Sequence, residues 1–209
     1  MSLRSSLRRL LFGPPIVVVS GLPRSGTSMA MKMLDAGGLP LVQDGARTAD
    51  EDNPKGYYED ERVMSLHDME DKSWLRACRG KGIKIVSNLL RALPANNNYQ
   101  VLFVRRDISE ILASQAKMLE RRGEDSATED DRMRELFESD VWRAQYLLRR
   151  QPQFEWTELH YREVLADPEG QARKMREFLG ADLEIEKMAA VVDPDLYRNR
   201  AGELTEVSS

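Results

Sequence analysis

A short apolar run, residues 16–20, is followed at once by a turn that carries two glycines, Gly21 and Gly26. The run Ile-Val-Val-Val-Ser has the β-branched content of a buried strand. Residues 27–36, behind the turn, have helical sequence. A strand, a glycine turn and a helix in this order bring backbone N–H groups to one point, where the helix dipole also favours an anion. The segment therefore predicts a phosphate-type site at the end of a strand.

The turn also has the outer spacing of the nucleotide-binding motif G-x-x-x-x-G-K-[ST], but Thr27 stands in place of the lysine. This departure weakens the case for a protein that binds ATP or GTP. The cation inside the turn is Arg24, whose fork of N–H donors suits a phosphate or a sulfate. By itself, the turn fits an ordinary strand-turn-helix with a surface arginine equally well.

A second strand with a basic end lies near the middle of the chain. Residues 99–104 read as a buried strand, and Arg106 follows shortly after it. Asp107 fits the N-cap of a helix over the next residues, with Glu110 as its capping-box partner. Ser114 then lies about two turns into that helix. Since open α/β sheets bind ligands at the carboxyl ends of their strands, Arg106 is a candidate ligand-binding residue.

The two elements together resemble the sulfotransferases that use 3′-phosphoadenosine-5′-phosphosulfate (PAPS). In that family the loop after the first strand wraps the 5′-phosphosulfate. A strand-end arginine, with a serine eight residues later, holds the 3′-phosphate. The resemblance implies that Arg106 and Ser114 bind the 3′-phosphate. It also implies that the phosphosulfate loop is formed by Arg24, Ser25, Gly26, Thr27 and Ser28.

Two looser similarities lie nearer the carboxyl end. The run over residues 160–180 is similar to a family segment in which a tyrosine contacts the adenine, which implies that role for Tyr161. Packing of Tyr161 on the following helix is the plain alternative. The C-terminal Arg-Lys-Gly signature of cytosolic members is missing, and Arg198 and Arg200 are the candidates to cover the 3′-phosphate instead.

Sulfuryl transfer needs a base for the acceptor proton and cations for the leaving phosphate oxygen. Cytosolic members use a histidine after the second strand, but residues 83–88 contain none. Other branches use a glutamate between the loop and the second strand, which implies Glu59. Two preceding tyrosines are expected to desolvate Glu59 and raise its pKa. Lys84 is expected beside the leaving group. The rival bases are three loop carboxylates and one histidine predicted to lie in a helix over 61–78, namely Asp44, Asp50, Glu51 and His67.

Strand candidates at 16–20, 83–86, 101–104 and 154–160 alternate with helical sequence along the chain. This alternation predicts an α/β fold, with a P-loop-like, mostly parallel sheet flanked by helices on both faces. A long amphipathic helix is expected over residues 129–150, and an extended loop over 37–60. We expect a basic amphipathic extension over 1–15, one α/β domain over 16–200 and a tail over 201–209.

Composition narrows the classes of partner. The 209 residues carry a net charge of −4, which argues against nucleic acid as the main partner. Cys78 is the only cysteine, so there is no internal disulfide, and with two histidines the chain offers no ordinary zinc cluster. No apolar run approaches the roughly 20 residues that span a bilayer. A reducing, cytoplasmic setting is expected.

The sequence therefore predicts a sulfotransferase that moves the sulfuryl group of PAPS to a hydroxyl or an amine, without a metal. The products are the sulfated acceptor and 3′-phosphoadenosine-5′-phosphate (PAP), and the acceptor is a small molecule, a carbohydrate or a peptide. Two alternatives stay open: a nucleotide kinase of the P-loop type, and a non-catalytic module that binds phosphonucleotides. Neither the acceptor nor the oligomeric state follows from the sequence.

Overall fold

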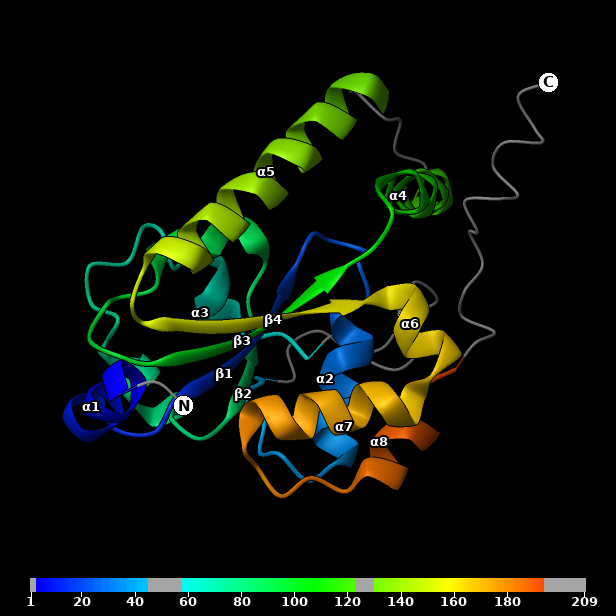
Figure 1. The fold of residues 1–209 in the computed structure, drawn as a ribbon. Helices are drawn as coiled ribbons and strands as arrows, with labels where there is room; N and C mark the ends of the chain where they lie inside the picture. The colour runs from blue at the N-terminus through cyan, green and yellow to red at the C-terminus, as the bar shows by residue number, and fades with distance from the viewer. Residues whose placement is uncertain (1–2, 45–57, 123–129, 194–209) are drawn as a thin grey trace.

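The computed structural model describes residues 3–44, 58–122 and 130–193. Four strands form one sheet in the order β2-β1-β3-β4 (Figure 1). Their bounds are β1 Ile16–Gly21, β2 Gly82–Lys84, β3 Tyr99–Arg105 and β4 Phe154–His160. Every pairing among these strands is parallel, which confirms the predicted class of fold. The second strand ends at Lys84 instead of Val86, because the chain turns there into a 3₁₀ segment.

Helices cover both faces of the sheet. The helices are α1 Leu3–Phe12, α2 Thr27–Ala36, α3 Glu61–Met64, α4 Ile108–Arg122, α5 Asp130–Arg150, α6 Tyr161–Ala166, α7 Pro168–Leu179 and α8 Ile185–Ala190, with 3₁₀ segments η1 Ser73–Cys78 and η2 Ser87–Ala92. Figure 1 shows α5 crossing one face of the sheet, while α2, α7 and α8 cover the other. The predicted helices over 27–36, 108–121 and 129–150 thus lie within a residue of the observed bounds.

Strand β1 is apolar on both faces because both are covered. Val17 and Val19 point into the core formed with α2, α7 and α8. Ile16 and Val18 point into the other core, to which α5 contributes Val141. Successive side chains of a strand alternate between faces, so a strand buried on both sides reads as a continuous apolar run.

The order of the strands places a topological switch point beside the carboxyl end of β1. The chain leaves β1 through α2 to reach β2 on one side, and β3 then lies on the other side of β1. The α4–α5 connection leaves β3 toward the face opposite to α2. Connections that diverge in this way from neighbouring parallel strands leave the binding crevice of an open α/β sheet. The loop 21–28 and Arg106 both lie at this edge.

The prediction of a single helix over residues 61–78 is wrong. Helix α3 ends at Met64, and the next helical segment, η1, begins only at Ser73. Asp71 accounts for the second start, since its carboxylate accepts hydrogen bonds from the backbone N–H of Ser73 at 2.8 Å and from its hydroxyl at 3.0 Å. Such local bonds compete with helix continuation. His67 consequently lies in a turn, half exposed and 3.2 Å from the Asp68 carboxylate, and not in a helix.

Helix α7 starts and stops where its sequence signals predict. Asp167 caps it by accepting a hydrogen bond from the N–H of Gly170 at 2.9 Å, and Pro168 is its first residue. Gly180 ends it with a φ of 61°, in the left-handed region that favours glycine. Helix α7 thus follows β4 and α6 directly and packs in the same core as α2.

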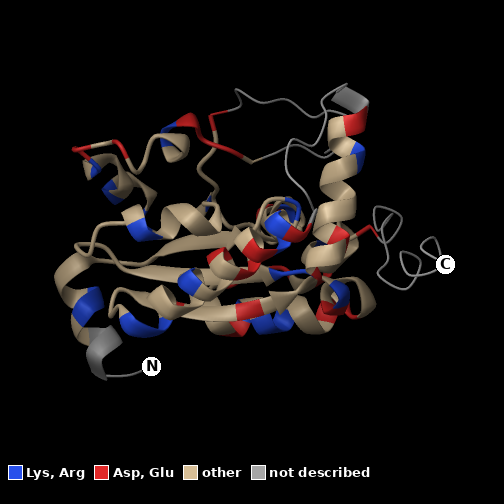
Figure 2. Ribbon diagram, turned by 90° about the horizontal axis from the view of Figure 1, so that it is seen from above, with Lys and Arg blue, Asp and Glu red and all other residues tan. Residues whose placement is uncertain are grey.

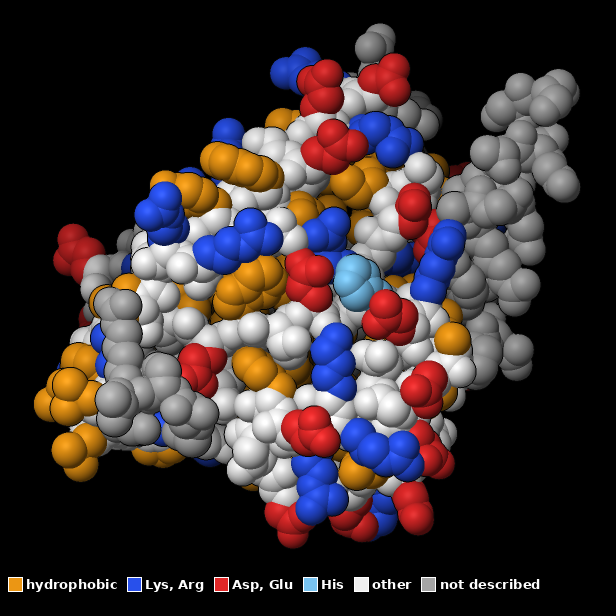
Figure 3. Space-filling model, in the orientation of Figure 1, with side chains coloured by type: hydrophobic (Ala, Val, Ile, Leu, Met, Phe, Trp, Pro, Cys, Tyr) orange, Lys and Arg blue, Asp and Glu red, His pale blue; other side chains and the backbone are white. Residues whose placement is uncertain are grey.

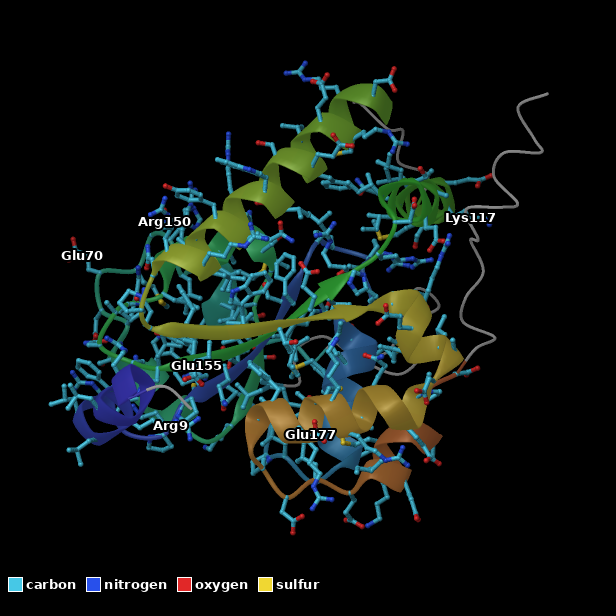
Figure 4. The ribbon with its side chains drawn as sticks, viewed as in Figure 1. Arg9, Glu70, Lys117, Arg150, Glu155 and Glu177 are labelled. Carbon is cyan, nitrogen blue, oxygen red and sulfur yellow. The ribbon has the colours of Figure 1, made fainter. Side chains whose placement is uncertain are left out.

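The basic extension packs on the domain through helix α1. Arg8 Nη2 donates hydrogen bonds to the carbonyl oxygens of Ala95 at 2.7 Å and Asn97 at 2.9 Å. Arg9 lies 3.8 Å from Glu155 on β4 (Figure 4). Within the described residues, no helix is both long and apolar enough to cross a membrane.

Candidate active site

The loop between β1 and α2 has the backbone of an anion cradle. Arg24 has a φ of 66° and Gly26 a φ of 104°, both in the left-handed region. Gly26 is also the N-cap of α2, so no side chain caps the first-turn amides of that helix. Amides at such a helix start favour an anionic ligand. The predicted turn and helix start are therefore present.

Buried hydroxyl groups add to the donors near this loop. Ser25 is 1% exposed and Ser20, at the end of β1, is 0% exposed. In the described part of the chain, neither hydroxyl oxygen finds a hydrogen-bond partner. Because a buried polar atom is normally paired, an unpaired hydroxyl in this loop fits a place where an anion binds.

Arg24, Ser114 and Arg106 meet beside this loop. Arg24 Nε donates a hydrogen bond to Ser114 Oγ on α4 at 3.1 Å. Arg106 Nη1 donates to the Arg24 carbonyl oxygen at 3.2 Å. The sequence assigned Arg24 to one phosphate element and Arg106 with Ser114 to another. The structure joins these elements in one basic cluster at the carboxyl ends of β1 and β3.

Tyr161 packs against the same loop. Its ring lies under the Arg106 guanidinium, whose carbon is 4.5 Å from the ring centroid. A Cβ added to Gly26 would come within 2.5 Å of Tyr161 Cδ2, so the loop and the ring are in close contact. Tyr161 is 6% exposed, and burial raises the pKa of its hydroxyl above the ordinary value. Tyr161 therefore lies beside the loop 21–28 and Arg106, and the contacts described for it are packing contacts.

Glu110 is the buried carboxylate that pairs with two arginines beside the loop 21–28. It is 0% exposed, and its Oε2 accepts a hydrogen bond from Arg106 Nε at 3.0 Å. Its Oε1 accepts one from Arg162 Nε on α6, also at 3.0 Å. Asp107 caps α4 as predicted, through a bond from the Ser109 N–H at 2.8 Å. Sequence reasoning gave Glu110 a capping role and missed both of these arginine contacts.

Glu59 and Lys84 form an ion pair at the carboxyl end of β2. Lys84 Nζ is 2.9 Å from Glu59 Oε1 and 3.4 Å from Ser28 Oγ. The Lys84 side chain is 10% exposed and that of Glu59 is 35% exposed. Glu59, Lys84 and the end of the loop 21–28 are thus neighbours, although they come from separate parts of the chain.

Two carboxylates near Glu59 have other contacts. Asp60 caps α3, accepting a bond from the Arg62 N–H at 3.1 Å. Asp44 Oδ2 accepts a bond from the Glu61 N–H at 2.6 Å. The remaining predicted site residues, Asp50, Glu51, Arg198 and Arg200, lie outside the described residues.

One partly buried polar pair was not predicted from the sequence. The Ser87 hydroxyl donates a hydrogen bond to the carboxylate of Asp140 on α5. Ser87 lies shortly after β2, in the stretch where cytosolic sulfotransferases carry the histidine that this chain lacks. The two residues are 53 apart in the chain, and no local motif marks the contact. The pair fixes η2 against α5 on the face opposite to α2.

Basic and acidic residues are interspersed over the elements of the domain (Figure 2). Among the described residues, no group of three or more His, Cys, Asp or Glu side chains is placed to hold a metal ion.

A surface hollow between α7 and α8 lies away from this site. It is lined by residues that include Arg176, Gly180 and Ile185. Gln100, near the start of β3, donates a hydrogen bond to the Phe178 carbonyl oxygen at the end of α7. This end of α7 therefore lies at the amino ends of the strands, opposite to the loop 21–28 and Arg106.

Solved structures and sequence families were compared with the chain. A sulfotransferase domain from the Synechococcus PCC 7002 olefin synthase is 13% identical, with a TM-score of 0.48 and coverage of 92% of this chain and 83% of that one. A sulfotransferase domain from the curacin biosynthetic pathway is 14% identical, with a TM-score of 0.49 and coverage of 88% and 89%. Likeness at this level says nothing of activity. No curated protein matches the chain in sequence.

The family comparison is more direct. A family model described as the sulfotransferase family matches residues 81–185, about half of the chain. The matched stretch contains Lys84, Arg106, Ser114 and Tyr161, whereas the loop 21–28 and Glu59 precede it. Because the match extends over half of its residues, the chain belongs to the sulfotransferase family.

Proposed function

We propose that this protein is a PAPS-dependent sulfotransferase whose active site is the crevice at the carboxyl ends of β1, β2 and β3. The observation that carries the proposal is the contact of Arg24 with Ser114 and Arg106. These residues come from two anion-binding elements that are more than 80 residues apart in the chain. A donor that carries a 5′-phosphosulfate and a 3′-phosphate on the same ribose requires two such elements close together.

The residues present suit such a donor. The amides and hydroxyls of residues 24–28 would hold the 5′-phosphosulfate, and Arg106 with Ser114 would hold the 3′-phosphate. Tyr161 would border the adenine, as the family resemblance implies, although the ring is buried against the loop and Arg106 before the donor binds. Arg198 and Arg200 remain candidates for the same phosphate. When bound, PAPS supplies an activated sulfuryl group with PAP as its leaving group.

Glu59 and Lys84 are proposed to carry the proton transfer and the charge stabilisation. Glu59 would take the proton from the acceptor hydroxyl or amine, since it borders the loop through Lys84 and Ser28. Lys84 would orient the Glu59 carboxylate before the reaction. It would also stabilise the negative charge that grows on the leaving phosphate oxygen. No residue of this scheme requires a metal.

The acceptor class stays broad in this proposal. The acceptor is a small molecule, a carbohydrate or a peptide with a hydroxyl or, as second choice, an amine. We place the enzyme in the cytoplasm because Cys78, its single cysteine, is a buried thiol, which fits a reducing compartment.

Calorimetric titration with PAP, 5′-AMP, ATP and GTP tests the proposed donor. PAP is expected to bind on the order of 10²-fold more tightly than 5′-AMP, because charge-assisted bonds to the 3′-phosphate contribute about 1.5–3 kcal/mol each. Preference for ATP or GTP over PAP would instead favour the P-loop-type kinase.

A transfer assay with ³⁵S-labelled PAPS over a panel of hydroxyl and amine acceptors tests the proposed reaction. Labelled product is expected for at least one acceptor class. Tight PAP binding with no transfer to any member of a broad panel would favour the non-catalytic module.

A further inference from the structure

Arg162 lies beside the proposed 3′-phosphate site, although no motif in the sequence points to it. It is the second residue of α6, directly after Tyr161. Its Nε donates to Glu110 Oε1 at 3.0 Å, and its Nη2 donates to the same oxygen. The Arg162 side chain nevertheless stays 56% exposed, so part of it is accessible from the solvent.

Glu110 connects Arg162 to Arg106. The carboxylate is 0% exposed and binds Arg106, which is 8% exposed, through its other oxygen. A buried carboxylate is costly unless it is paired, and two guanidinium groups compensate it here. Arg106 also contacts the backbone of Arg24, so the described contacts link three arginines to one buried carboxylate. These arginines outnumber the described carboxylates here even when Asp193, which lies near Tyr161, is counted with Glu110, and Arg162 is the most exposed of the three.

We propose that Arg162 is a further specificity-determining residue for the 3′-phosphate, held in place by Glu110 as a positioning residue. The inference rests on the proposed function, since it assigns a residue to the same donor. A phosphate monoester carries two negative charges near neutral pH and accepts bonds from several donors. Arg106 would meet it from the strand end, and Arg162 from the solvent side. The proposal does not depend on Arg198 or Arg200.

The chain offers a matched control for Arg162. Arg173 on α7 has the same side-chain exposure, 56%, and is also ion-paired, at 2.7 Å from Glu169. It lies on another helix and has no contact with Glu110 among those described. Arg162→Ala and Arg173→Ala therefore remove the same charge and similar exposed surface, and only the first removes it from the proposed site.

Both variants and the unmodified protein are titrated with PAP, 5′-AMP and inorganic phosphate by calorimetry. Arg162→Ala is expected to weaken PAP binding by about 10-fold, the value of one charge-assisted contact, and to leave 5′-AMP binding unchanged. Arg173→Ala is expected to change neither. Inorganic phosphate separates recognition of a nucleotide 3′-phosphate from general anion binding, and it is expected to bind far more weakly than PAP.

The outcomes separate the two levels of the proposal. If the unmodified protein binds PAP and 5′-AMP equally, the proposed function fails. If it prefers PAP but Arg162→Ala keeps that preference, the role of Arg162 is wrong. Equal weakening of PAP and 5′-AMP by Arg162→Ala would also overturn that role. A thermal unfolding curve for each variant confirms that the fold is intact.

Glu110→Gln tests the positioning role separately. The substitution keeps the size of the side chain but removes the charge that orients both guanidinium groups. The preference for PAP over 5′-AMP is expected to fall severalfold. An unchanged or increased preference would contradict positioning by Glu110 and leave Arg162 to be judged from its own variant.

Discussion

At the scale of single residues, the ion pair of Glu59 with Lys84 places a carboxylate and an ammonium group beside Ser28 at the end of the loop 21–28. Sequence reasoning proposed both residues, but separately and for different reasons. Their contact joins the residues just before α3 to the end of β2. It supports the proposal that one acts on the acceptor proton while the other acts on the leaving oxygen.

Glu59→Gln keeps the size and hydrogen bonding of the side chain and removes its basicity. Sulfuryl transfer is expected to fall by roughly 10²–10⁴-fold while PAP affinity holds, because only the proton acceptor is lost. Labelled transfer and calorimetry measure the two effects. Asp44→Asn, in the same loop region, is the control and is expected to retain transfer. The opposite pattern would make Asp44 the base.

Glu110→Ala tests the buried carboxylate as a stabilising residue. Removing it leaves Arg106 buried without its main partner, and loss of one member of a buried ion pair costs about 3–5 kcal/mol. Denaturant unfolding measures this free energy. Glu169→Ala breaks an exposed pair with Arg173 and is expected to cost at most about 1 kcal/mol. Similar losses for the two variants would show that Glu110 is not a structural centre.

At the scale of elements, the loop and the start of α2 depend on the close contact of Gly26 with Tyr161. Gly26 has a φ of 104°, and an added Cβ would be 2.5 Å from the Tyr161 ring. The left-handed conformation by itself favours glycine at this position. The structure adds a second reason, because the ring of Tyr161 already occupies that space.

Gly26→Ala and Gly38→Ala form a matched pair for this loop. Gly38 also has a positive φ, 91°, but an added Cβ there meets nothing within 4 Å. Gly38→Ala is expected to cost about 1–2 kcal/mol from backbone strain and to keep PAP affinity. Gly26→Ala should cost more in unfolding free energy and weaken PAP binding by at least 10-fold. Equal PAP affinity in the two variants would contradict the loop as the anion cradle.

Elements with their own end signals could be predicted from sequence. The glycine turn before α2 and the Asp167-Pro168 start of α7 gave correct bounds, because caps and turns are local. The prediction of one helix over 61–78 was wrong. The sequence there is helical in character, but the carboxylate of Asp71 starts a new segment by binding the Ser73 N–H. The Arg162 contact with Glu110 joins residues 52 apart in the chain, and only the packing of α6 beside α4 reveals it.

At the scale of the whole molecule, the domain has an apolar interior and a partly apolar surface. Cys78 and Tyr99 are buried, and burial raises the pKa of each above its ordinary value. Because these two groups are in the core, stability at high pH depends on residues away from the proposed site. On the surface, apolar side chains lie exposed along α5 (Figure 3), among them Leu136, Trp142 and Tyr146.

The buried thiol and phenol predict a loss of stability at alkaline pH. Above about pH 9 the unfolded chain releases protons from cysteine and tyrosine that the folded state still keeps. The unfolded state then binds fewer protons, so the unfolding free energy falls as pH rises. Denaturant unfolding at pH 8, 9 and 10 measures the slope. Tyr99→Phe should flatten it, and a slope unaffected by that change would contradict the assignment.

A structure of the protein with PAP bound would test the proposed donor site at atomic detail. We expect the 5′-phosphate to lie against the amides of residues 24–28 and the 3′-phosphate against Arg106, Ser114 and Arg162. Glu59 and Lys84 should border the open side of the 5′-phosphate. PAP bound in the reverse direction, or away from the carboxyl ends of β1 and β3, would show that the proposed site is wrong.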